Sequence, residues 1–326
     1  MSDASLPSLP LSLVVPAYNE VESLALLHEK IRAAVEPLNL MWEVIYIDDG
    51  STDRSADVMR DLQRRDNHVV VAVLRRNSGK SLALDVGFSL ARGQTIITMD
   101  ADLQDEPAEI PRLLAKLDEG YDLVTGWKQN RQDPLTKRLP SWVANQVTGL
   151  VTGLHLHDMN SGLKAFRADC ARDLRLYGDL HRYIPVLVHF NGYRVTEIPV
   201  VHHKRQFGRS KFGAGRLLRG GFDLMTVLFL NNYRYRPLHL FGTTGIIMLL
   251  AGFLINLYLS IEWFEGVRPL SQRPLLTLGV LLMVMGVQLL TMGLLAEMIV
   301  SFIRRSEDPL RIAARIYRPA DEEDQP

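Results

Sequence analysis

Residues 95–105 have the sequence Thr-Ile-Ile-Thr-Met-Asp-Ala-Asp-Leu-Gln-Asp, an apolar run followed directly by three acids. A short apolar run with β-branched residues predicts a buried strand over 95–99, and the acids then leave its carboxyl end. In an open α/β sheet, ligands bind at that edge. Asp100 and Asp102 can share a divalent cation with a phosphate ligand, because Mg²⁺ takes only a few oxygens from protein. Asp105 is expected to cap the helix that begins at Pro107, a role that needs only one of the three acids.

The pattern around this stretch predicts an α/β fold. Apolar runs that predict strands alternate with segments of helical periodicity. The predicted strands are 11–15, 43–47, 69–74 and 95–99, and the predicted helices are 21–35, 53–65, 79–92 and 107–119. This alternation indicates a parallel sheet with right-handed crossovers. The loops at Pro16, Asp48 and Asp100 should therefore meet at one edge of the sheet.

A Gly-Lys-Ser sequence at 79–81 ends like a phosphate-binding P-loop. A P-loop also needs a glycine five residues before Gly79, and that position is Leu74, so an ATPase is not expected. Lys80 is expected either to reach a phosphate or carboxylate across the cleft or to be solvated at a helix start. The glycine fingerprint of dinucleotide-binding folds is also absent from the first loop, which contains Pro16 and Tyr18.

The composition of the 326 residues narrows the class of protein. There are 37 basic and 37 acidic side chains, and this balance argues against a nucleic-acid binder, which would carry a basic excess. Cys170 is the only cysteine, so the chain has no intramolecular disulfide and no cysteine-rich zinc site. Cys170 is expected to be a small buried apolar residue.

Two segments near the C-terminus are long and apolar enough to cross a membrane. Residues 238–261 and 275–295 contain no Asp, Glu, Lys or Arg. Arginines flank the pair on both outer sides, whereas the connecting loop balances Arg268 and Arg273 with Glu262 and Glu265. The positive-inside rule then predicts two spans in the cell membrane with the N-terminal region in the cytoplasm. Glycines recur every seven residues in both segments, at 245 and 252 and at 279, 286 and 293, which indicates helix packing or contacts in a homo-oligomer.

A basic stretch precedes the first span. Residues 202–211 contain four Lys or Arg interleaved with glycine and serine, and an amphipathic segment over 216–230 follows. A phosphate group at a membrane surface is what such a cluster would meet. His202 and His203 have no acidic or cysteine partner nearby in the sequence, so they are not assigned to a metal.

Five motifs in order resemble the family 2 glycosyltransferases. They are Pro16-Ala17-Tyr18-Asn19-Glu20, Asp48-Asp49-Gly50-Ser51, Asp100-Ala101-Asp102-Leu103-Gln104, Asn160-Ser161-Gly162 with Lys164-Ala165-Phe166-Arg167, and R-x-x-G-x-S-K over Arg205–Lys211. The set is most similar to the branch that moves a sugar from a nucleotide to a polyprenyl phosphate, as dolichol-phosphate mannose synthase does. The two-span tail is of the kind found in bacterial members.

The resemblance implies a GT-A fold, inverting transfer and a set of site residues. Pro16, Tyr18, Glu20, Ile47, Asp49, Asp100, Ala101 and Lys128 would bind the nucleotide sugar. Asp102 with Gln104 would bind Mg²⁺ or Mn²⁺ on the diphosphate, and Arg205, Arg209 and Lys211 would contact phosphate. Asp100, Asp102 and Asp158 are the catalytic candidates, and the role of Asp158 stays open.

The expected organisation has five parts. These are an N-terminal extension (1–10), a cytoplasmic GT-A catalytic domain (11–215), an amphipathic interface segment (216–237), a two-helix transmembrane domain (238–303) and a cytoplasmic tail (304–326). The expected partners are a nucleotide-sugar donor with UDP or GDP, an undecaprenyl or dolichyl phosphate acceptor and membrane lipids, with no nucleic acid.

Two other functions fit the same motifs. A family 2 transferase that extends a glycan would use a carbohydrate hydroxyl as acceptor and would normally need a general base. A non-catalytic membrane subunit would keep the nucleotide pocket without turnover, although the intact acids at 100 and 102 argue against it. A lipid phosphate needs no such base, because the second pKa of a phosphate monoester is about 6.

Overall fold

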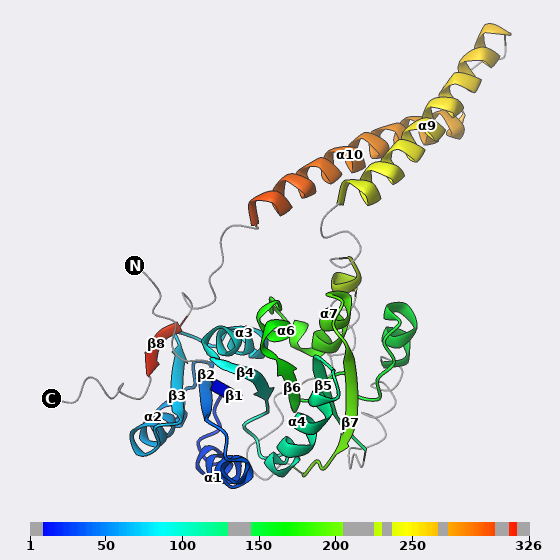
Figure 1. The fold of residues 1–326 in the computed structure, drawn as a ribbon. Coiled ribbons are helices and arrows are strands. Elements are labelled where there is room, and N and C mark those ends of the chain that lie inside the picture. The colour runs from blue at the N-terminus through cyan, green and yellow to red at the C-terminus, as the bar shows by residue number, and fades with distance from the viewer. Residues whose placement is uncertain are drawn as a thin grey trace. The chain divides into compact units, whose positions relative to one another are not determined.

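The computed structural model describes residues 9–129, 145–204, 225–229, 237–266, 273–303 and 313–317. The chain forms two compact units (Figure 1). The first, the sheet unit, comprises Met1–Val227 with Asp308–Pro326, and the second, the helical hairpin unit, comprises Leu228–Glu307. Each unit is described by itself below.

The sheet unit is built on one mixed sheet, which has eight strands among the described residues. Their order across the sheet is β7-β5-β6-β4-β1-β2-β3-β8. The strands are β1 (Leu9–Ala17), β2 (Trp42–Asp48), β3 (Val69–Leu74), β4 (Gly93–Thr98), β5 (Leu123–Lys128), β6 (Lys164–Arg167), β7 (Val195–Val200) and β8 (Ala313–Tyr317). Strands β1 to β4 pair in parallel, as do β5 and β7. The predicted parallel sheet is therefore confirmed for the first half of the chain.

Helices cover both faces of this sheet (Figure 1). The α-helices are α1 (Leu24–Val35), α2 (Ser55–Arg65), α3 (Lys80–Leu90), α4 (Ile110–Asp118), α6 (Ala168–Arg172) and α7 (Ile184–Phe190), and residues 145–152 are also helical. Short 3-10 helices lie at η1 (Glu36–Leu38), η2 (Pro107–Glu109) and η3 (Leu180–Tyr183). The helix predicted over 107–119 is thus divided into η2 and α4, each with a proline in its first turn.

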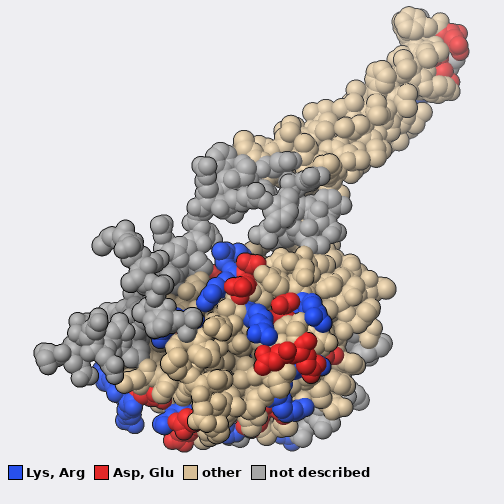
Figure 2. Space-filling model, viewed as in Figure 1, with Lys and Arg blue, Asp and Glu red and all other residues tan. Residues whose placement is uncertain are grey.

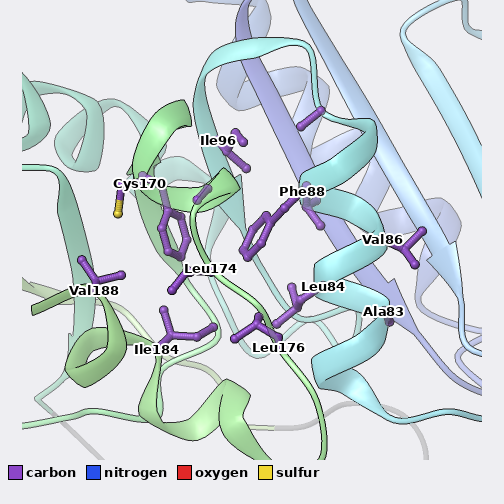
Figure 3. Close-up of a cluster of buried hydrophobic side chains, with 14 of the residues drawn as sticks. Ala83, Leu84, Val86, Phe88, Ile96, Cys170, Leu174, Leu176, Ile184 and Val188 are labelled. Carbon is purple, nitrogen blue, oxygen red and sulfur yellow. The ribbon is translucent and has the colours of Figure 1, made fainter. Parts of the chain in front are cut away.

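Alternation along the strands creates a separate core on each face. Val14 of β1 joins the cluster under α3, α6 and α7, whereas its neighbours Leu13 and Val15 join the cluster under α1, α2 and α4. Figure 3 shows the first cluster, where Leu84 and Phe88 of α3 meet Leu174 and Ile184 from later in the chain. Cys170 is fully buried in the same cluster, which confirms its predicted role as a small apolar residue.

Two strands run against the parallel set. Strand β6 is inserted between β4 and β5 and is antiparallel to both. Strand β8 comes from beyond the second long apolar helix and pairs antiparallel with β3 at the edge of the sheet. No local sequence pattern predicts either placement, because strand pairing depends on contacts between segments that are far apart in the chain.

The helical hairpin unit consists of α9 (Pro237–Phe264) and α10 (Pro274–Ile303). Within them, Leu238–Phe264 and Pro274–Ala296 are long and apolar enough to span a membrane, and most of their surface is exposed. In Figure 2 the described surface of this unit is almost wholly uncharged, with acidic side chains near its far end.

Glycines hold the two long helices close together. A Cβ on Gly252 would lie 2.5 Å from the backbone oxygen of Gly279, and one on Gly286 would lie 2.6 Å from that of Gly245. The seven-residue glycine spacing therefore serves packing within the chain, since only glycine allows this backbone approach. Contacts in a homo-oligomer remain a prediction.

Candidate active site

The loops after β1 and β2 meet through hydrogen bonds at the carboxyl edge of the sheet. The Asn19 N–H donates to Ser51 Oγ (2.9 Å), and the Thr52 N–H donates to Asn19 Oδ1 (2.8 Å). Glu20 joins the same junction, because its N–H donates to Ser55 Oγ (2.9 Å). The predicted convergence of these loops is confirmed.

Asp49 connects this junction to α3. The Ser78 and Gly79 N–H groups donate to its two carboxylate oxygens at 2.7 and 3.0 Å. Burial raises the pKa of Asp49, and these two donors oppose the rise because they favour the carboxylate. Gly50 has φ +66, and a Cβ there would lie 2.4 Å from the Arg76 backbone. Only glycine permits this approach of the second loop to the start of α3.

The loop at 100–105 follows β4 at the same edge. The Gln104 N–H donates to Asp102 Oδ1 (3.2 Å), and Leu103 between them has φ 61, a left-handed conformation that is rare for leucine. Leu103 is fully buried, so packing holds this strained backbone in place. Strain of this kind concentrates at functional sites, because surrounding structure must maintain it.

Lys80 forms an ion pair with Asp100. This confirms one of the two expectations for Lys80, that it reaches a carboxylate across the cleft. Both side chains remain about one-third exposed, at 31% and 32%, so the pair faces solvent. The Lys80 ammonium is therefore accessible from solvent.

Asp105 does not cap the helix at Pro107, and that prediction is wrong. The N-cap of η2 is Glu106, and no side chain hydrogen-bonds there. Asp105 is instead buried, 3.9 Å from Lys128 Nζ and 3.5 Å from His202 Nδ1. Attraction to Lys128 and the contact with His202 hold the pKa of Asp105 well below its usual range despite its burial.

Lys164 lies at the centre of the buried charges. It comes from β6, is 3% exposed, and donates to the Ser161 backbone oxygen. Burial, with repulsion from Lys80, lowers the pKa of Lys164 to about 7, and attraction to Asp158 and Asp100 opposes this shift. Asp158 is itself buried, and its Oδ1 accepts the Asn160 N–H (3.1 Å).

Gly162 packs against the carboxylates of Asp100 and Asp105. A Cβ on Gly162 would lie 2.6 Å from the Asp100 carboxyl carbon and 2.7 Å from Asp105 Oδ2. The motif Asn160-Ser161-Gly162 therefore brings its backbone directly against the acidic loop. The motif was noted in the sequence, but nothing in the sequence showed that the glycine touches these carboxylates.

The Lys164 environment predicts a pH-dependent stability. Between its folded pKa of about 7 and its ordinary value of 10.5, the unfolded chain holds a proton that the folded chain has lost. Unfolding free energy therefore rises with pH across this interval. We expect Lys164→Met to lack this rise, so the difference in Tm between wild type and variant should change from pH 7 to pH 9. Each kcal/mol of change in unfolding free energy should shift Tm by about 2–4 °C. Thermal unfolding of the detergent-purified chain measures both Tm values. A Tm difference that stays constant from pH 7 to pH 9 would contradict the prediction.

The structure places most of the predicted site residues at this edge. The loops and strand ends just described carry Asp49, Asp100, Ala101, Asp102, Gln104, Lys128 and Asp158. Pro16 lies near the end of β1, and Tyr18 and Glu20 lie on the loop that follows it. The Ile47 side chain is fully buried in the core, so only the Ile47 backbone could make the contact with the nucleotide sugar that was predicted for this residue. Arg205, Arg209 and Lys211 lie outside the described residues. The cluster also contains Lys164, Asp105 and His202, which were not predicted from the sequence to belong to the site.

The donor set at Asp102 and Gln104 fits a hard divalent cation. The Asp102 carboxylate and the Gln104 amide, with one residue between them, offer oxygen ligands, the type that Mg²⁺ and Mn²⁺ prefer. Within the described part of the chain, no three His, Cys, Asp or Glu side chains gather to hold a metal by themselves. A cation here would therefore take further ligands from substrate and water.

Comparison with known proteins gives the family. Residues 12–175 match the model "Glycosyl transferase family 2". Among curated proteins, the chain is 39% identical over 316 residues to dodecaprenyl-phosphate galacturonate synthase of Rhizobium johnstonii, covering 95% of this chain and 94% of that protein. It is 38% identical over 319 residues to undecaprenyl-phosphate 4-deoxy-4-formamido-L-arabinose transferase of Salmonella paratyphi A, covering 97% and 94%.

Solved structures agree on the fold. Glucosyl-3-phosphoglycerate synthase from Mycobacterium tuberculosis, in complex with Mn²⁺, UDP-glucose and phosphoglyceric acid, aligns with a TM-score of 0.52 at 20% identity, covering 68% of this chain and 80% of that one. The predicted GT-A fold, a mixed sheet with flanking helices followed by two apolar helices, is confirmed. By its sequence, this chain belongs to glycosyl transferase family 2.

Proposed function

We propose that this chain transfers a sugar, with inversion, from a nucleotide diphosphate to a polyprenyl phosphate. The observation that carries the proposal is the convergence of three loops at one sheet edge. Lys80 pairs there with Asp100, and Asp49 accepts the N–H groups of Ser78 and Gly79 directly before Lys80. The two relatives named above, which match this chain along nearly its whole length, are polyprenyl-phosphate sugar transferases by name. The long apolar helices α9 and α10 suit an enzyme whose acceptor is a membrane lipid.

The donor would bind across the first three loops. Pro16, Tyr18 and Glu20 on the first loop, with Asp49 and the Ile47 backbone on the second, would hold the base and ribose. Asp100 and Ala101 would continue that pocket. Lys80 lies within reach of the donor phosphates through its contact with Asp100, and Lys128 lies behind the same loop.

Asp102 and Gln104 would hold Mg²⁺ or Mn²⁺ against the diphosphate. When bound, such an ion supplies Lewis-acid stabilisation of the charge that develops on the departing nucleotide. The chain's own contribution is to keep these ligands in place. Buried Leu103 and the hydrogen bond from the Gln104 N–H to Asp102 fix the loop before substrate arrives.

The acceptor phosphate is already an oxyanion at neutral pH, since its second pKa is about 6. The protein therefore mainly has to position it, and a general base is not required. Arg205, Arg209 and Lys211 supply the cations for that task. Asp158 is buried and hydrogen-bonded to its own loop, which favours a role in fixing the 158–162 loop.

We further propose that α9 and α10 are two membrane spans and that the sheet unit is the catalytic domain and is cytoplasmic. The outer flanks carry Arg234 and Arg236 on one side and Arg304, Arg305 and Arg311 on the other. Two spans return the chain to the side from which it left, so residues before and after the hairpin belong to one compartment. Strand β8 and β3 belong to the same sheet, which supports this topology because they lie on opposite sides of the hairpin in sequence.

The test is a donor screen with the purified full-length chain and undecaprenyl phosphate in detergent. Radiolabelled UDP and GDP sugars are supplied one at a time with Mg²⁺ or Mn²⁺. A lipid-extractable, mild-acid-labile product is expected from one of them. Label transferred only to a carbohydrate acceptor would support the glycan-extending alternative, and nucleotide binding without turnover on any donor would support a non-catalytic subunit.

A further inference from the structure

We propose that Glu197 of β7 is a positioning residue that fixes the 157–162 loop, the segment that carries Asp158 and Gly162. This rests on the proposed function, because the reaction that the loop serves is the sugar transfer proposed above. Glu197 was not predicted from the sequence to belong to the site. It would act through the loop and not through contact with substrate.

The Glu197 carboxylate caps the start of this loop. Its two oxygens each accept the His157 N–H at 3.0 Å, and one of them accepts the Asp158 N–H at 3.4 Å. The carboxylate also contacts Nδ1 of the His157 ring. The Glu197 side chain is only 13% exposed, so little water competes for these contacts. Hydrogen bonds to an ionised carboxylate are stronger than neutral ones, so this one side chain anchors two consecutive residues of the loop.

Two further contacts hold His157 in the same place. Its ring stacks on Trp127 of β5, with the ring centroids 4.0 Å apart. Its backbone oxygen accepts a hydrogen bond from Asn145 Nδ2 (2.7 Å). Of these three neighbours of His157, Glu197 is the one that also binds the Asp158 N–H. The Glu197 carboxylate therefore extends the anchored part of the loop to a catalytic candidate.

The other end of the loop is held from β4 and β6. Thr98 Oγ1 donates to the Gly162 backbone oxygen (2.9 Å), and Lys164 donates to the Ser161 backbone oxygen. Gly162 packs directly against the Asp100 carboxylate. A shift of the loop would therefore be transmitted to Asp100, a proposed donor contact.

The sheet register places these anchors in one row. Lys164 pairs with Thr98 of β4 and with Thr125 of β5, and Thr125 pairs with Glu197 of β7. Side chains of directly paired residues lie on the same face of a sheet, so all four side chains share one face. Adjacent strands are about 4.8 Å apart, so the row from Thr98 to Glu197 is about 14 Å long. The loop bridges this row, and the sheet itself sets the position of the Glu197 anchor.

The experiment compares Glu197→Gln with His157→Phe in the full-length chain. Glutamine keeps the shape of glutamate but has no charge, and it offers one acceptor oxygen where glutamate offers two. We expect Glu197→Gln to lower kcat for transfer to undecaprenyl phosphate about 10- to 100-fold, because the charge-assisted contacts with the loop are lost. The Kd for the free donor nucleotide should stay within about threefold of wild type, since most of the proposed base and ribose contacts lie at the ends of β1 and β2.

His157→Phe separates the ring of His157 from its backbone. Phenylalanine can still stack on Trp127 and keeps the backbone N–H that Glu197 accepts, but it has no Nδ1. We expect its kcat to stay within about threefold of wild type. A loss as large as that in Glu197→Gln would show that Glu197 acts through the imidazole and would overturn the positioning of the backbone.

Glu43→Gln is the matched control. Glu43 is also a buried carboxylate, and it accepts the Arg92 N–H (2.8 Å) and Ser12 Oγ (2.6 Å) at the start of β2. This variant should lower the thermal unfolding temperature and leave kcat of the folded protein unchanged. Wild-type kcat in Glu197→Gln, or an equal fall of kcat in Glu43→Gln, would overturn the proposal.

A wild-type chain that makes no lipid-linked product would defeat the proposed function separately. The anchoring of the loop is then measured by hydrogen exchange of a peptide that covers 155–163. Faster exchange of this peptide in Glu197→Gln, with wild-type exchange in His157→Phe and Glu43→Gln, supports the anchoring. Wild-type exchange of the same peptide in Glu197→Gln overturns it.

Discussion

Asp102→Asn is expected to abolish sugar transfer, lowering kcat/KM by at least roughly 10³-fold. Asparagine keeps the oxygen that accepts the Gln104 N–H, so the loop should retain its shape. It lacks the negative charge that would hold a divalent cation on the diphosphate, and without that cation the departing nucleotide is not stabilised. Transfer from nucleotide sugar to undecaprenyl phosphate, at saturating Mg²⁺ and Mn²⁺, measures the effect.

The control for this prediction is Asp85→Asn. Asp85 on α3 is also buried, and its Oδ1 accepts the N–H of Leu176 (3.0 Å). The same chemical change there should alter stability but preserve transfer by the folded protein. Undiminished activity in Asp102→Asn would falsify the metal assignment.

The second large effect is expected for Gly162→Ala. The added Cβ would lie 2.6 Å from the Asp100 carboxyl group and 2.7 Å from Asp105 Oδ2, closer than real Cβ contacts. The backbone of the 160–162 loop or the acidic loop must shift, at a cost of about 1–3 kcal/mol in unfolding free energy. Asp100, a proposed donor contact, and the buried Asp105 then move, so we expect activity to fall at least roughly 10²-fold. Transfer rate and nucleotide Kd are measured on the folded fraction.

Gly93→Ala separates packing strain from damage to the site. A Cβ on Gly93 would lie 2.5 Å from the Ser12 backbone nitrogen and 2.7 Å from its Oγ, a clash of similar severity at the start of β4. It should destabilise the chain comparably and leave nucleotide Kd unchanged. Equal loss of nucleotide affinity in the two variants would show that Gly162 has no special relation to the site.

The candidate site was predictable only in part. Asp100, Asp102 and Gln104 follow a strand end, a position that hydrophobic periodicity reports directly. Lys80 was visible as a cation at a helix start, although the sequence left its partner open between phosphate, carboxylate and water. His202 was set aside for lack of an acidic neighbour in the sequence. Its partner, Asp105, is 97 residues earlier in the chain.

Asp105 shows why the remainder was out of reach. Its sequence position before Pro107 is that of a good helix cap, and local propensity favours that role. The backbone instead turns the carboxylate inward, where Lys128 of β5 and His202 of the segment after β7 lie beside it and compensate its burial. Only the packing of three distant segments decides between the two roles, and no local pattern reports it.

The sequence by itself determined the features that depend on neighbours along the chain. These are the alternation that builds the parallel half of the sheet, the acidic turn after 95–99, and two apolar segments long enough to span a bilayer. The tertiary structure alone decided the insertion of antiparallel β6, the return of β8 to β3, and the burial of Lys164 beside Asp100 and Asp158. Periodicity and segment length are carried by consecutive residues, whereas strand order and buried charge pairs depend on free energies summed over residues far apart in the chain.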